Sequence, residues 1–501
     1  MMHIGIERIG EPNALLRSIS LGLSAFLLLL PLATVFGQKP DRTKPPRLGP
    51  SPSLKLPPIQ HLKLSNDLPV LVMEKHQVPL VQIELIVFTG SAMDPPEMKG
   101  VASITAAMMD EGAGSRNALE LADAIDFLGA NVNTFAEQHY SGVVLHTPLS
   151  KLDSALALFA DVALHPTFPA DELERIRKER LTTLAQWHDE PPQIATVLLG
   201  KTLFGTGHPY GRLQFGDEKS LRSVSVSDLK KFHSTYFRAN NASLIIVGDV
   251  TASSILTKLE QLFGKWDKGK VEQPSIPPVA QVKDRMIYLI DKPGAPQSVI
   301  RIGRIGAPRL TEDYFPLLVM NTILGGSFTS RLNQNLREQH GYTYGAGSAF
   351  EFLPAPGAFE AGADVQTKVT DKSLAEFMKE LNGIRKSVSD TELMRAKNYL
   401  TLRYPGNFQS VAQVARQLRE LVLYRLPDDY FNDYSRRILA VTKEDVERVA
   451  RKYIDPENIA IIVVGDRKAI EQGVGALKLG PIKNLSIDDV LGPAPVLGPE
   501  R

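Results

Sequence analysis

Residues 226–250 read VSDLKKFHSTYFRANNASLIIVGDV, and residues 441–467 read VTKEDVERVARKYIDPENIAIIVVGDR. The two stretches align without a gap over four landmarks: an Asp, a Tyr, an Asn and a final Gly-Asp. Each stretch predicts an amphipathic helix, a turn at the Asn and a short apolar strand that ends at Gly-Asp. Because the four landmarks recur at one constant spacing, the chain is predicted to contain an internal repeat.

The repeat divides the chain into two homologous domains in tandem, at about 61–265 and 283–475. The stretch between them, 266–282, is polar and broken by proline, which is typical of a linker. Each half opens with strands and continues with long helices, a pattern that favours an α+β fold over strict alternation. We therefore expect two sheets, each rich in antiparallel pairs and covered by helices on one face. Residues 476–501 are expected to form a Gly- and Pro-rich tail.

The first 37 residues are expected to be a signal peptide. Two arginines precede the apolar stretch SISLGLSAFLLLLPLATVFGQ, and small residues lie near a plausible cleavage point. A membrane anchor is the alternative, but the stretch is short for a span and Pro31 interrupts it. Residues 38–60 are rich in Pro and Lys and are expected to be a linker. Export of a chain without cysteine favours a bacterial periplasm.

The composition narrows the classes of function. The chain has 501 residues, enough for two or three domains with sizeable cores. Its 57 basic and 56 acidic side chains nearly cancel, so no overall charge favours binding to nucleic acid or to an anionic membrane. The absence of cysteine excludes disulfides, thiolate metal sites and a cysteine nucleophile.

Four further motifs follow in order: GSAMDPPEMKGVASITAAMM at 90–109, FLGANVNTF at 127–135, HPYGRLQFG at 208–216 and NTILGGSFTSRLNQNLREQHGYTYG at 321–345. In order and spacing they resemble the insulinase/pitrilysin-type (inverzincin) zinc peptidases. The resemblance is to the two-repeat branch that includes the mitochondrial processing peptidase and bacterial relatives. It implies a chain whose two domains form half of a clamshell.

The resemblance also shows what this chain lacks. In active members a helix carries His-x-x-Glu-His, in which two His bind zinc and the Glu acts as general base. Here Ser103, Ala106 and Ala107 stand at those positions, and Thr183 stands where a later helix carries the third ligand, a Glu. No two of the ten His are three or four positions apart, so no displaced helical pair is expected to bind metal. We expect no metal, cofactor or catalytic residue in this chain.

Three residues match substrate-binding positions of the family. Arg337 and Tyr344 match an Arg and a Tyr that hold substrate opposite the metal, and Asn133 matches an Asn on an edge strand that accepts an extended peptide. A guanidinium can bind a peptide carbonyl, and a phenol can donate to an oxyanion. Structural alternatives remain open: Arg is favoured at a helix C-terminus, Tyr is common in strands, and the strand around Asn133 could be an ordinary sheet strand.

The resemblance implies a non-catalytic subunit of a heteromeric zinc metallopeptidase. Its homologous partner would carry the zinc and the His-x-x-Glu-His helix, and the substrate would be an oligopeptide or an unfolded peptide. The location would be the periplasm, without a membrane span once the signal is cleaved. One alternative is a stand-alone peptide-binding or scaffold protein. Another is an enzyme with an unrecognised site.

Overall fold

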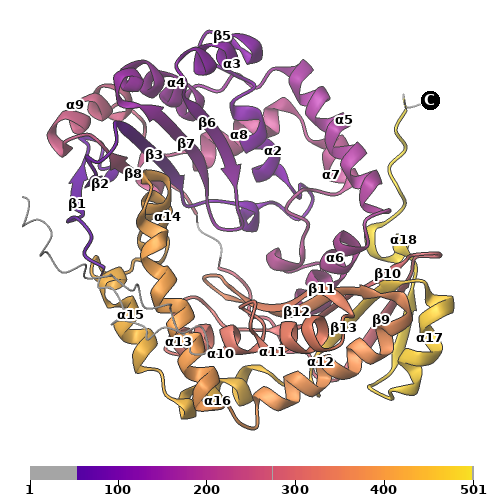
Figure 1. Ribbon diagram of the computed structural model, residues 1–501. Coiled ribbons are helices and arrows are strands. Elements are labelled where there is room, and N and C mark those ends of the chain that lie inside the picture. Colours follow the sequence, from indigo (N-terminus) through magenta and orange to yellow (C-terminus); the bar gives the residue numbers. More distant parts are fainter. Residues whose placement is uncertain (1–53, 273–274, 499–501) are drawn as a thin grey trace, which may run out of the picture. The chain divides into compact units, whose positions relative to one another are not determined.

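The computed structural model describes residues 54–272 and 275–498 (Figure 1). The expected signal segment and residues 38–53 of the expected linker lie outside these ranges, and the described residues belong to one compact unit. The domain boundaries given above stay predictions. Within the described ranges, no helix has both the length and the apolar character needed to cross a bilayer.

The first repeat contains a six-stranded sheet in the order β1-β2-β8-β3-β7-β6. The strands are β1 (Gln60–Lys63), β2 (Pro69–Glu74), β3 (Leu80–Val87), β6 (Asn131–Ala136), β7 (Ser141–Pro148) and β8 (Ala242–Gly248). Four neighbouring pairs are antiparallel, and only β2 and β8 run parallel.

The second repeat contains a six-stranded sheet in the order β11-β12-β10-β13-β9-β14. The strands are β9 (Met286–Asp291), β10 (Gln297–Ile305), β11 (Thr343–Phe352), β12 (Pro356–Gln366), β13 (Ala460–Gly465) and β14 (Ile482–Leu485). Read from β14, this order repeats the first sheet, with β9, β13, β10, β12 and β11 in the places of β2, β8, β3, β7 and β6. The α+β class and the two homologous units are therefore confirmed.

Helices connect the strands in both repeats. Those before the linker are α2 (Val101–Met109), α3 (Ala118–Phe127), α4 (Leu152–Leu164), α5 (Ala170–Trp187), α6 (Pro191–Phe204), α7 (Glu218–Ser223), α8 (Val226–Tyr236) and α9 (Ala252–Phe263). Those after it are α10 (Tyr314–Leu324), α11 (Arg331–Asn333), α12 (Thr370–Ile384), α13 (Asp390–Arg403), α14 (Val411–Tyr424), α15 (Tyr430–Ala440), α16 (Lys443–Tyr453), α17 (Arg467–Ala476) and α18 (Ile487–Leu491). Short pieces complete the described parts of the chain: β4 (Gly112–Ala113), β5 (Arg116–Asn117), six 3₁₀ turns and one π-helical turn.

The repeated stretch folds in the same way in both copies. Helix α8 begins at a capping box formed by Ser225 and Asp228, and α16 begins at one formed by Thr442 and Asp445. Strands β8 and β13 follow these helices and lie at equivalent interior places of their sheets. The repeat predicted from the landmarks is thus present at the level of helix caps and strand order.

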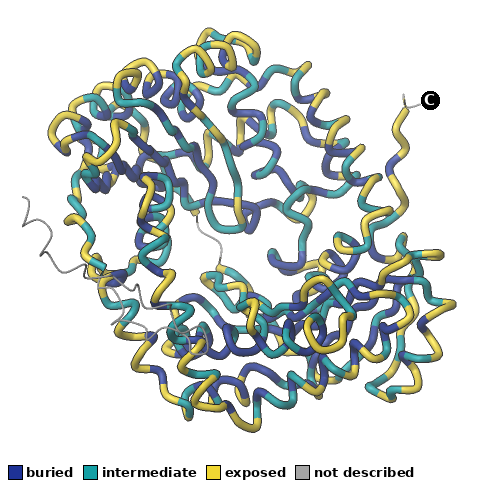
Figure 2. Tube along the Cα trace, viewed as in Figure 1, coloured by how far each residue is buried: buried dark blue, intermediate teal, exposed yellow. Residues whose placement is uncertain are grey.

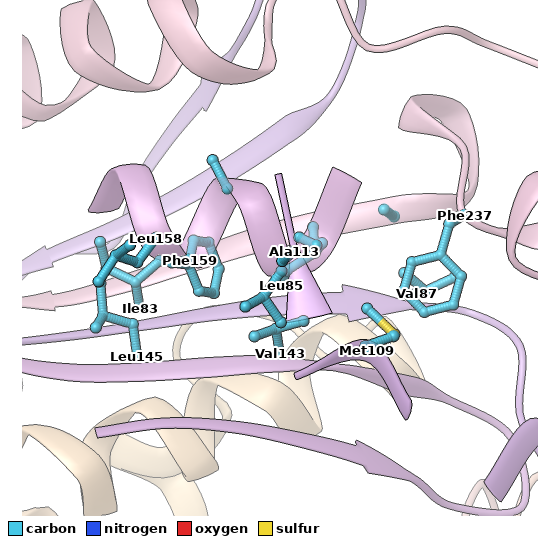
Figure 3. Close-up of a cluster of buried hydrophobic side chains, with 14 of the residues drawn as sticks. Ile83, Leu85, Val87, Met109, Ala113, Val143, Leu145, Leu158, Phe159 and Phe237 are labelled. Atoms are coloured by element: carbon cyan, nitrogen blue, oxygen red, sulfur yellow. The ribbon is translucent and has the colours of Figure 1, made fainter. Parts of the chain in front are cut away.

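One face of each sheet packs on helices of its own repeat. In the first sheet Ile83 and Leu85 of β3 lie beside Val143 and Leu145 of β7, and Phe159 of α4 packs on them (Figure 3). All five side chains are buried. Since side chains alternate along a strand, the intervening residues of β3 point to the opposite face of the sheet.

The opposite face of each sheet is covered by a helix from the other repeat. Helix α14 packs on β3 and β8, where Ile245 and Val247 meet Leu418. Helix α6 packs on β10 and β13, where Ile462 meets Leu198 (Figure 1). Strands β8 and β13 are therefore buried on both faces, and Figure 2 shows them in dark blue. The prediction of helices on one face did not include this exchange.

Candidate functional site

Helix α2 carries the positions that the resemblance assigns to the zinc motif, and Asp94 fixes its first turn. The Asp94 carboxylate accepts hydrogen bonds from the main-chain N–H of Gly100 at 2.7 Å and of Ala102 at 3.0 Å. Burial raises the pKa of Asp94 to about 7. Farther along the helix, Ser103 is partly exposed and Ala106 is 4% exposed. The helix thus presents a short hydroxyl and methyl groups at the motif positions.

The side chain of α5 that reaches Ser103 is Arg180. Its Nη2 donates to the Ser103 main-chain oxygen at 3.0 Å and to Ser103 Oγ at 3.1 Å. Its Nη1 donates to the Phe215 main-chain oxygen at 3.1 Å, and its guanidinium carbon lies 4.8 Å from the centroid of the Phe215 ring. Thr183, one turn later, donates its hydroxyl to the carbonyl of Glu179 in its own helix. A guanidinium therefore faces the first motif position.

The residues at the four motif positions do not fit a zinc ion. Proteins hold Zn²⁺ with imidazole nitrogen, thiolate or carboxylate, and these positions offer two hydroxyls and two methyl groups. The Ser103 hydroxyl also accepts a hydrogen bond from a cation. Within the described parts of the chain, no three His, Asp or Glu are grouped so that they could hold a metal. No catalytic step through a metal held by this chain can be derived.

Ser103 lines a cavity of about 530 Å³ whose wall comes from both repeats. Trp187 and Tyr210 contribute from the first repeat, and Glu351 and Glu360 contribute from the second. Burial raises the pKa of both glutamates above their ordinary value. Ser103, at the first position of the zinc motif, therefore shares a cavity with Glu351 and Glu360, which lie far away in the sequence.

Arg337 and Tyr344, which the sequence singles out, line one further cavity of about 1030 Å³. Phe328 and Glu360 also line it, and Glu360 is shared with the cavity at Ser103. The two cavities therefore adjoin at this glutamate. Asn133 is not among the described residues that line either cavity.

The local fold explains the position of Arg337. It lies in a π-helical turn, Gln334–Gln339, and the N–H of Gly341 donates to its carbonyl at 3.0 Å. Gly341 has a φ of +62°, a conformation that favours glycine and ends the helix. The Arg337 guanidinium carbon lies 4.5 Å from the Phe328 ring centroid, and Nη1 is 3.5 Å from the carboxylate of Glu338. Gly341 therefore ends the helical segment that carries Arg337.

Tyr344 lies on β11 and is 91% exposed. Because it is so exposed, it makes little contribution to the core and is available to a ligand in the cavity. A guanidinium donates to carbonyl or carboxylate oxygens, and a phenol can donate or accept. Arg337 and Tyr344 together can therefore bind the main chain of a peptide.

The two sheets have edge strands at equivalent places, but the edges differ. At β11 the side chain of Asn333 accepts from the N–H of Ala346 at 3.3 Å, and that of Asn321 donates to the carbonyl of Ser348 at 3.0 Å. These two contacts occupy main-chain groups that another strand would need.

Strand β6 carries Asn133 and ends the first sheet, so the predicted edge position is confirmed. Strand β6 forms a hairpin with β7, which lies inside the sheet. Asn133 is exposed, and in the described chain the outer side of β6 has no main-chain hydrogen bond beyond the sheet. Of the two equivalent edges, β6 is the one open to an added strand.

Sequence reasoning missed Arg180, Asn321 and Asn333. A signal for Arg180 exists, because it lies three residues before Thr183 and so projects from a neighbouring part of the same helix face. The two asparagines carry no such signal, since their partners on β11 are set by tertiary packing.

Comparison with known proteins agrees with this geometry. The family described as Insulinase (Peptidase family M16) matches residues 69–212, and the Peptidase M16 inactive domain matches residues 223–400. Together the two matches cover more than half of the chain.

Some individual relatives are named as zinc proteases, and others are named as non-peptidase homologs or inactive domains. The chain is 27% identical over 287 residues to an uncharacterized zinc protease, YmxG, of Bacillus subtilis, a match that covers 57% of this chain and 68% of that protein. It is 21% identical over 429 residues to the non-peptidase homolog YmxG of Helicobacter pylori, covering 84% of this chain and 97% of that one. The crystal structure of a peptidase M16 inactive domain from Pseudomonas fluorescens superposes with a TM-score of 0.76 at 29% identity, covering 81% of this chain and 98% of that one.

Proposed function

The chain belongs to the insulinase (M16) peptidase family, and we propose that it is a non-catalytic, metal-free subunit of a periplasmic heteromeric zinc metallopeptidase. A homologous partner carries zinc and the His-x-x-Glu-His helix, and this chain supplies Arg337 and Tyr344 to the peptide. One observation carries the proposal: two cavities adjoin at Glu360. One contains Ser103 in place of the family's first zinc ligand, and the other has polar groups suited to a peptide main chain.

The open edge of β6 supports a peptide as the substrate. An extended peptide can add to this strand through main-chain hydrogen bonds, with Asn133 beside it. The asparagines that cover β11 leave β6 as the edge for this binding mode. Binding through the main chain suits an oligopeptide or an unfolded segment of varied sequence.

The periplasmic location rests on the sequence of residues 1–37. The division of labour rests on the chemistry of the motif positions, because a peptidase of this family needs imidazole and carboxylate groups that this chain lacks. A homologous subunit is the simplest source of these groups.

Affinity purification of the tagged chain from its native periplasm tests the proposal. We expect a homologue that bears His-x-x-Glu-His to co-purify, and zinc and oligopeptide cleavage to be found only in the complex. Arg337→Ala and Tyr344→Phe should lower the rate at which the complex cleaves oligopeptide more than they lower the amount of homologue that co-purifies. Arg416→Ala is the matched control, because Arg416 is exposed on α14 and lines neither cavity.

Two results would contradict the proposal. The first is a chain that purifies without such a homologue. The second is a complex whose turnover is the same with and without Arg337. Peptide binding by the chain alone, unchanged in both variants, would instead identify a stand-alone peptide-binding or scaffold protein.

A further inference from the structure

Arg180 is a buried cation held by oxygen atoms and one aromatic ring. It is 7% exposed, and no Asp or Glu of the described chain forms an ion pair with it. Its hydrogen-bond acceptors are the carbonyl and hydroxyl of Ser103 and the carbonyl of Phe215. Burial lowers the pKa of Arg180 to about 10, so the guanidinium keeps its charge at neutral pH. The atoms that bind the guanidinium directly are therefore neutral oxygens, whereas the carboxylates of Asp94 and Glu179 act on it only through longer-range electrostatic attraction.

The place of this charge matters more than its presence. Ser103 stands at the first metal-ligand position of α2, and Arg180 comes from α5, the helix that carries Thr183 at the third. We infer that the Arg180 guanidinium replaces the metal: it joins α5 to α2 and excludes divalent cations from the position that Ser103 marks. This replacement is independent of whether the chain has a peptidase partner.

The chemistry of the guanidinium suits both parts of this role. Its planar, rigid set of N–H donors lets it bind the two oxygens of Ser103 from one nitrogen and Phe215 from another. The Phe215 ring covers the guanidinium and keeps water away from it. In such surroundings a second cation is repelled more strongly than in water. If an imidazole were placed at position 103, the nearby Arg180 guanidinium would therefore repel any metal ion that the imidazole could bind.

Grafting the missing ligands tests the exclusion of metal. The full chain with Ser103→His, Ala106→Glu, Ala107→His and Thr183→Glu is compared with the same graft that also carries Arg180→Met. Zn²⁺ binding is measured by calorimetry, with circular dichroism to verify folding. We expect at least 100-fold tighter binding in the graft without Arg180. Equal affinities, including no binding in either protein, would overturn the inference.

Arg177→Met in the same graft is the matched control. Arg177 is on α5 one turn earlier, and it donates to the carbonyls of Leu221 and Val224 instead of Ser103. Its removal subtracts the same charge from the same helix and should leave zinc binding unchanged. A gain as large as that from Arg180→Met would also overturn the inference.

A rescue experiment tests the joining of the helices and does not depend on the graft. Arg180→Ala in the natural chain should lower the Tm and leave a hole shaped for a guanidinium. Ethylguanidinium should then raise the Tm of Arg180→Ala by at least ~2 °C more than it raises that of the natural chain. Ethylurea, which has a similar shape and no charge, should not. Equal responses of the two proteins to ethylguanidinium would overturn the inference.

Discussion

Arg419 of α14 and Glu84 of β3 form an ion pair although 335 positions separate them. Arg419 Nη2 lies 2.8 Å from Glu84 Oε2, and Nε donates to the same oxygen at 2.9 Å. Glu84 is 1% exposed and points to the sheet face that α14 covers. The pair therefore compensates a buried carboxylate at the contact where the second repeat lends a helix to the first.

Removal of one partner of this pair should destabilise the chain strongly. Arg419→Met leaves the Glu84 carboxylate buried without a counter-charge, which costs about 3–5 kcal/mol of unfolding free energy. Adding Glu84→Gln should recover more than half of that loss. Arg416→Met, on the exposed side of α14, should change the free energy by less than about 0.5 kcal/mol. Urea unfolding measures all three, and a double variant as unstable as Arg419→Met would contradict the expectation.

The exchange of α6 and α14 predicts that neither repeat folds by itself. A fragment of residues 275–498 lacks α6 and exposes the apolar face of β10 and β13, whereas a fragment of residues 54–272 lacks α14 and exposes that of β3 and β8. We expect each fragment alone to bind a hydrophobic dye and to unfold without a cooperative transition. Mixed during refolding, they should form a 1:1 complex. A monomeric fragment with cooperative unfolding would refute this view.

His233 predicts a loss of stability in mild acid. Burial lowers the pKa of His233 to about 4, and its Nε2 lies 3.0 Å from the carbonyl of Ala163. Its ordinary value is 6.5, so between pH 6.5 and 4 the unfolded chain binds the proton more readily than the folded chain. Stability is therefore present above pH 6.5 and falls as the pH drops, by at most about 1.4 kcal/mol per unit.

His233→Gln tests this titration, because glutamine can donate to Ala163 and has no proton to gain. Urea unfolding at a series of pH values should show a slope smaller in the variant than in the natural chain across this window. Parallel curves for the two proteins would show that His233 titrates alike in both states.

Asn333 should protect one amide at the edge of the second sheet. The N–H of Ala346 donates to Asn333 Oδ1 at 3.3 Å, and no other acceptor within the described chain takes its place at this edge. Asn333→Ala removes a hydrogen bond worth about 1 kcal/mol, so the Ala346 amide should exchange about fivefold faster. Asn382→Ala, which removes an asparagine bond within α12, is the control. Unchanged exchange at Ala346 would mean that β11 is covered by other means.

Much of the architecture could be read from the repeat around Val226 and Val441. Helix caps, the turn at Asn and the Gly-Asp strand ends each depend on a few neighbouring residues, so they can be recognised in the sequence. The continuous apolar runs of β8 and β13 also signalled burial on two faces, but not which helix would cover the second face.

The amino-acid sequence by itself determined the repeat, the α+β class and the loss of zinc donors at positions 103, 106, 107 and 183, because these depend on residue identity and short-range spacing. Tertiary structure alone decided that α6 and α14 change places between repeats, that asparagines cover β11, and that Arg180 reaches Ser103. These contacts join residues from distant parts of the chain. No local pattern in the sequence specifies which charged side chain, or which helix, tertiary packing places against a given surface.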